Sequence, residues 1–68
     1  MDARQKIVAA MVGRIRSEGW TQAYTAEILG VSQPRVSDLL NKRAEKFSLD
    51  ALVNLLEPLG MTLDIWIG

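Results

Sequence analysis

Apolar residues recur at helical spacing along most of the chain, and glycine or small polar residues separate one apolar stretch from the next. Residues 3–17 carry their apolar side chains on one helical face, and Gly19 follows as a left-handed stop. This pattern predicts an amphipathic first helix. Its apolar stripe consists of Ile7, Val8, Met11, Val12 and Ile15.

Two short helices are predicted next. The second follows Thr21, a good N-cap residue, and ends at Gly30. The third follows Ser32 as N-cap and ends about Asn41. Pro34 lies in its first turn, where a missing N–H is tolerated.

A fourth helix is predicted after Ser48 as N-cap. Phe47 and Leu52 have the spacing of a hydrophobic staple across that cap. Pro58 interrupts the helix near its end and Gly60 finishes it. The residues expected to face inward are Leu52, Val53, Leu55, Leu56 and Leu59.

The period changes in residues 61–67, where every second residue is apolar, as in a half-buried strand. No other segment of the chain reads as a strand, and a lone strand leaves its backbone unpaired. We therefore expect it to pair with the same strand of a second copy around a two-fold axis. An extended tail packed on the helices is the alternative. The expected dimer-interface residues are Met61, Leu63, Ile65, Trp66 and Ile67.

The chain has 68 residues, which indicates a single domain spanning residues 1–68. It contains no Cys and no His, so disulfides, thiolate metal sites and the usual general base are missing. We expect no enzyme activity, no cofactor and no metal. No apolar run reaches membrane-spanning length and the N-terminus lacks a signal-peptide core, so a cytoplasmic protein is expected.

The formal net charge is zero, but the charge is unevenly distributed. Residues 1–47 hold eight basic and five acidic residues, a net charge of +3, and residues 48–68 hold three acidic residues and nothing basic. Basic residues on one part of a chain favour contacts with nucleic-acid phosphates. Ordinary solvated surface charge is the alternative interpretation.

The spacing of small and apolar residues in residues 21–41 predicts a helix-turn-helix. Two helices joined by a short turn cross closely only where a small residue lies between them, and Ala26 meets that need. Gly30 permits the positive φ of the turn. Val36 and Leu39 would then pack the second helix onto the first, and such a helix fits the major groove of DNA.

The segment TQAYTAEILGVSQPRVSDLL, residues 21–40, resembles the XRE family of lambda-repressor and Cro-like helix-turn-helix regulators. Residues 42–60 are similar to a narrower branch, the small HigA-like antitoxin regulators. The resemblance implies a mainly α fold of four to five helices with a C-terminal strand that pairs across a dimer.

The resemblance also implies site residues. Gln22 matches a Gln that touches phosphate, and Gln33 and Pro34 open the recognition helix where base contacts begin. Helical geometry independently places Ser37, Asp38 and Asn41 on the face opposite the buried one. The candidate DNA-binding residues, with the nearby basic ones, are Gln22, Gln33, Pro34, Arg35, Ser37, Asp38, Asn41, Lys42 and Arg43.

Three residues depart from the family pattern. Tyr24 replaces the Glu that would complete a capping box, and Thr25 is more polar than usual at its position. Asp38 puts a carboxylate toward an anionic groove, where it can accept from cytosine N4 but lowers general affinity.

The expected function is a sequence-specific regulator that binds double-stranded DNA at a palindromic operator as a homodimer and represses its own operon. An antitoxin that neutralises a toxin protein, with DNA binding as autoregulation, is the first alternative. An adaptor helix-turn-helix with no DNA role is the second.

Overall fold

Each α-helix of the computed structural model, which describes residues 2–62, begins with a side-chain cap. The helices are α1 (Ala3–Glu18), α2 (Gln22–Leu29), α3 (Gln33–Leu40) and α4 (Leu49–Leu56). Thr21, Ser32 and Ser48 accept from the backbone N–H three residues later, which confirms the three predicted caps. Asp2 caps α1 in the same way, and the Gln5 side chain returns a bond to the Asp2 N–H. This reciprocal pair is a capping box, and its sequence motif is Asp-x-x-Gln.

A residue with positive φ ends α1, α2, α3 and the helical stretch that runs from α4 to Leu59. Gly19, Gly30 and Gly60 have φ of 70°, as their predicted role as stops requires, and Lys42 after α3 has φ of 57°. The N–H of the residue after each of these donates to the carbonyl of the residue five positions before it in the chain. These bonds are Trp20 to Ile15 (3.4 Å), Val31 to Ala26 (3.1 Å), Arg43 to Asp38 (3.0 Å) and Met61 to Leu56 (3.0 Å). This is the Schellman arrangement.

The residue after the left-handed one is apolar at three of these ends. Trp20, Val31 and Met61 are half-buried and pack against the core. Such a contact commonly accompanies a Schellman ending and fixes the direction in which the chain leaves. After α3 the corresponding residue is Arg43, which is exposed.

Two short 3₁₀ turns complete the described part. The turn η1 (Ala44–Lys46) lies between α3 and α4, and nothing in the hydrophobic pattern indicates it. The turn η2 (Glu57–Leu59) contains Pro58 and continues α4. The predicted interruption of the fourth helix near Pro58 is therefore confirmed, because the α-helix ends at Leu56.

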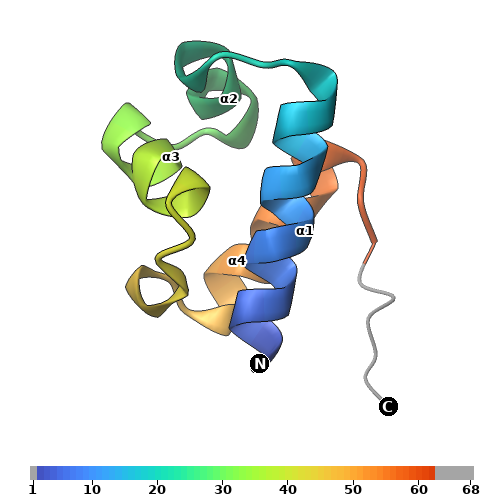
Figure 1. The fold of residues 1–68 in the computed structure, drawn as a ribbon, viewed down its shortest axis with the longest axis vertical. Helices are drawn as coiled ribbons and strands as arrows, with labels where there is room; N and C mark the ends of the chain where they lie inside the picture. The colour runs from blue at the N-terminus through green and yellow to red at the C-terminus, as the bar shows by residue number, and fades with distance from the viewer. Residues whose placement is uncertain (1, 63–68) are drawn as a thin grey trace.

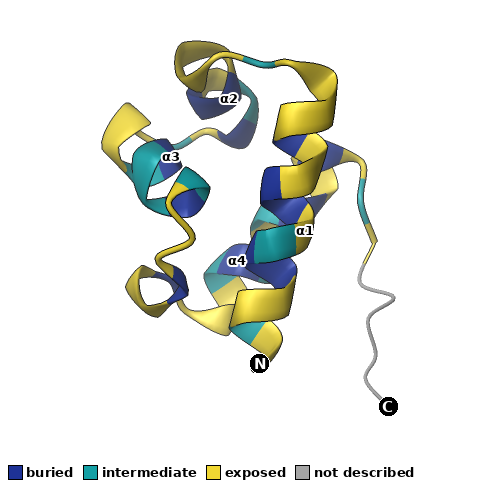
Figure 2. Cartoon of the chain, viewed as in Figure 1, coloured by how far each residue is buried: buried dark blue, intermediate teal, exposed yellow. Residues whose placement is uncertain are grey.

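The core forms around α1, which runs in front of α4 with α2 and α3 to one side (Figure 1). All five residues of its predicted stripe are buried, each at most 2% exposed. They face Leu29, Leu39, Phe47, Leu52, Leu56 and Leu59 from the other elements. Buried segments accordingly lie on the inward sides of the helices and exposed ones outside (Figure 2).

The described residues form a mainly α fold with four α-helices and no strand. Met61 and Thr62 are not in a strand. Met61 instead closes the Schellman arrangement at Gly60, where its N–H donates to the Leu56 carbonyl. The rest of the predicted strand, residues 63–67, lies outside the described residues. Within residues 2–62, no helix has the length and apolar character needed to cross a membrane.

Candidate nucleic-acid interface

The turn between α2 and α3 has the geometry that the small residues predict. Gly30 takes the left-handed conformation, and its N–H and that of Val31 both donate to the Ala26 carbonyl, at 2.9 and 3.1 Å. Ala26 itself is buried. Val36 and Leu39 are also buried, so one side of α3 is fixed on the rest of the domain.

The opposite side of α3 is polar. Gln33, Pro34 and Asn41 are exposed, and Ser37 and Asp38 are half-buried. The predicted outward face is therefore present, although its middle is less open than its two ends. Gln22, the first residue of α2, is also exposed.

The C-terminal half of this face is held by internal bonds. The Asn41 side-chain amide donates to the Ser37 carbonyl at 2.9 Å and reaches its Oγ at 3.4 Å. Arg43 Nη1 lies 3.3 Å from Asp38 Oδ1 in an ion pair. The structure thus pairs Asn41 with Ser37 and Arg43 with Asp38. Helical angles place the first two residues on one face but do not reveal the second pair.

Arg35 is engaged with the segment that leads to α4. Its Nη1 donates to the Lys46 carbonyl at 3.0 Å, and its guanidinium lies 4.2 Å from the centre of the Phe47 ring. Arg4 of α1 donates to the Phe47 carbonyl at 3.3 Å. We name Arg4, Arg35, Lys46 and Phe47 the Phe47 joint, because Phe47 connects α1, α3 and the start of α4.

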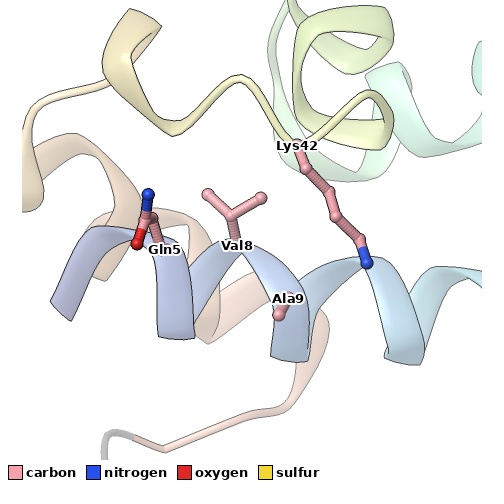
Figure 3. Close-up of a pocket in the computed structure, with 4 residues that line it drawn as sticks. All are labelled: Gln5, Val8, Ala9 and Lys42. Atoms are coloured by element: carbon pink, nitrogen blue, oxygen red, sulfur yellow. The ribbon is translucent and has the colours of Figure 1, made fainter. Parts of the chain in front are cut away.

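Lys42 lies over α1. Together with Gln5, Val8 and Ala9 it lines an open hollow of about 230 Å³, and its side chain extends toward α1 (Figure 3). Among the candidate cations, Lys42 faces α1, Arg35 belongs to the Phe47 joint and Arg43 pairs with Asp38. Each of these three candidate cations therefore has a different neighbour. Of the expected dimer residues, Met61 is half-buried, and Leu63, Ile65, Trp66 and Ile67 lie outside the described residues.

The N-terminal part of α2 explains two departures noted in the sequence. Tyr24 donates its N–H to Thr21 Oγ1 at 3.1 Å, so the cap forms on one side only. Its exposed ring packs in a T-shaped arrangement with the Trp20 ring, with centroids 5.5 Å apart. Thr25 is fully buried and donates its hydroxyl to the Thr21 carbonyl at 2.7 Å, which satisfies it.

Comparison with known proteins gives one family. The comparison with curated protein sequences found no match. A family model described as a helix-turn-helix domain matches residues 1–68. The match covers the capped helices, the Gly30 turn and the polar face of α3, and the chain therefore belongs to this helix-turn-helix domain family.

Proposed function

We propose that this protein is a sequence-specific regulator that binds double-stranded DNA through α3 and represses its own operon. One observation carries the proposal: α3 is anchored by buried Val36 and Leu39 and presents an opposite polar face that opens at Gln33. A helix of this kind fits the major groove, and donors and acceptors on its exposed side can read base edges. XRE-family membership remains part of the proposal and rests on residues 21–40.

The direct test is binding to the DNA upstream of the protein's own gene, measured by mobility shift against an unrelated duplex of equal length. We expect preferential binding to the upstream duplex. Gln33→Ala should change the preference at one base position by roughly 1–3 kcal/mol of discrimination. Asn54→Ala, on the exposed side of α4, is the matched control and should leave binding unchanged. Equal affinity for both duplexes would contradict sequence-specific regulation.

The antitoxin role is the second candidate function. It is supported by the similarity of residues 42–60 to HigA-like regulators. Co-expression with the adjacent reading frame should give a stable complex with a toxin. An operon without a toxic neighbour would count against this role.

A further inference from the structure

We propose that the Asp38–Arg43 ion pair competes with DNA phosphate for Arg43. The pair would lower binding to DNA of any sequence, and it would release Arg43 where a base-edge amino group engages Asp38. The inference rests on the DNA-binding function proposed above and adds a specificity mechanism to it.

The end of α3 itself brings the two side chains together. Lys42 reverses the chain at φ 57°, and Arg43 then donates its N–H to the Asp38 carbonyl at 3.0 Å. The guanidinium reaches the Asp38 carboxylate at 3.3 Å. Because the backbone bond already holds Arg43 next to Asp38, the ion pair loses less conformational entropy than one formed by two independent side chains.

The stop after α3 differs from the other three described stops in two ways. Gly19, Gly30 and Gly60 occupy the left-handed position elsewhere, and an apolar residue packs after each. After α3 these positions hold Lys42 and Arg43. A glycine and an apolar residue end a helix at least as well, so ending α3 does not explain the two charged residues.

The pair is suited to exchanging partners. The Arg43 side chain is 53% exposed and the Asp38 side chain 22%. Ion pairs at such positions contribute little net stability, so a phosphate can replace the carboxylate. A phosphate contact made by Arg43 alone leaves Asp38 unpaired beside an anionic backbone, which opposes binding.

A hydrogen bond from a base to Asp38 removes this unfavourable contribution to binding. In the major groove the cytosine N4 and adenine N6 amino groups are the donors, and a carboxylate is an acceptor for them. When such a donor engages Asp38, the carboxylate keeps a partner and Arg43 is free to bind phosphate. Recognition of the base and the phosphate contact are thereby coupled.

The test uses Asp38→Asn in the full chain, with a duplex of arbitrary sequence as probe and fluorescence anisotropy across a range of KCl concentrations. Releasing Arg43 should tighten this binding at low salt. It should also make the slope of log affinity against log salt more negative by about 0.9 for each bound chain. Glu45→Gln is the matched control. It removes the same charge, and Glu45 forms no ion pair within residues 2–62. It should leave the slope unchanged.

Arg43→Gln identifies the route of the effect. In the Arg43→Gln background, Asp38→Asn should no longer change the slope, because no arginine is left to release. An equal effect of Asp38→Asn with and without Arg43, or an effect equal to that of Glu45→Gln, overturns the inference. Asp38→Ala serves as a second variant, and unfolding curves confirm that each variant is folded at the temperature of the binding experiment.

The DNA upstream of the gene separates the two proposals. Asp38→Asn should lower the ratio of affinity for the upstream duplex to affinity for the arbitrary duplex, and an unchanged ratio overturns the coupling. Wild-type protein that binds neither duplex overturns the DNA-binding function itself.

Discussion

Lys42 and Gly30 have nearly the same backbone conformation, but Lys42 carries a long charged side chain and Gly30 carries none. Both end a helix of the helix-turn-helix in the left-handed region, at φ 57° and 70°. A Cβ in this region approaches the following carbonyl, which costs roughly 1–2 kcal/mol. Lys42 therefore carries a strain that glycine avoids.

We expect Lys42→Gly to stabilise the protein by about 0.5–1 kcal/mol, since relief of strain exceeds the added freedom of the unfolded chain. Gly30→Ala is the mirror experiment. A Cβ at Gly30 has nothing within 4 Å, so its expected loss of about 1 kcal/mol comes from the backbone alone. Urea unfolding measures both. A Lys42→Gly variant no more stable than wild type would contradict the strain.

Thr25 shows how a polar residue is accommodated in the core of α2. The Thr21 carbonyl that accepts its hydroxyl also accepts its N–H, at 2.9 Å. Removing the hydroxyl with Thr25→Val leaves that carbonyl bonded, so we expect a change of less than about 1 kcal/mol in unfolding free energy. Thr25→Ala should cost more, because it also leaves a void. Equal losses in thermal unfolding would argue against this account.

At the scale of elements, the Phe47 joint fixes the position of α3 relative to α1 and α4. Arg35 is bonded to Lys46 and lies over the Phe47 ring, and Arg4 holds the Phe47 carbonyl. A cation over an aromatic ring contributes about 0.5–1 kcal/mol at an exposed site. Arg35 therefore has a structural role whether or not it also meets phosphate.

A double-mutant cycle between Arg35→Ala and Phe47→Leu tests the joint. We expect a coupling of about 0.5–1 kcal/mol in unfolding free energy, because leucine keeps an apolar residue in the core and removes only the ring. Arg16→Ala, on the exposed surface of α1, should show no coupling with Phe47→Leu. Additive effects of Arg35→Ala and Phe47→Leu would mean that the ring and the guanidinium do not interact.

The elements predicted correctly are those that local patterns determine. Thr21, Ser32 and Ser48 start helices, and Gly19 and Gly30 stop them, through bonds that close within a few residues. The exposed face of α3 follows from helical angles in the same way. The contact between Arg35 and Phe47 does not follow from helical angles, because the chain between them turns through η1, which the hydrophobic pattern does not indicate. The Asp38–Arg43 pair was missed because it depends on Lys42 taking a conformation usual for glycine.

At the scale of the whole molecule, the basic residues fall before Phe47 and the predicted pairing strand falls after Gly60. If two copies pair through residues 61–67, as we propose, both α3 helices must lie on the same side to meet one DNA duplex. For major-groove binding they would lie about 34 Å apart, one turn of DNA. The palindromic operator expected from the sequence depends on this dimer.

Deleting residues 63–68 should give a monomer with much weaker operator binding. Met61 must be kept, because its N–H bonds to Leu56 and its side chain packs on the core. Ile65→Pro removes a strand donor without shortening the chain and should act in the same direction. Thr62→Ser is a conservative control. Sedimentation velocity reports the oligomeric state, and a truncated protein that sediments as a dimer would exclude pairing through this segment.

The four helix stops bear on how the chain folds. Each closes between residues five apart, so little chain entropy is lost in forming it. The Phe47 joint, in contrast, connects Arg4 with a residue 43 positions away. Contacts between residues close in the chain tend to form before contacts between distant residues, and proteins rich in local contacts fold faster. A change at Gly30 should therefore slow refolding, and a change at Phe47 should mainly speed unfolding, so that two positions of one small domain act on opposite limbs of its kinetics.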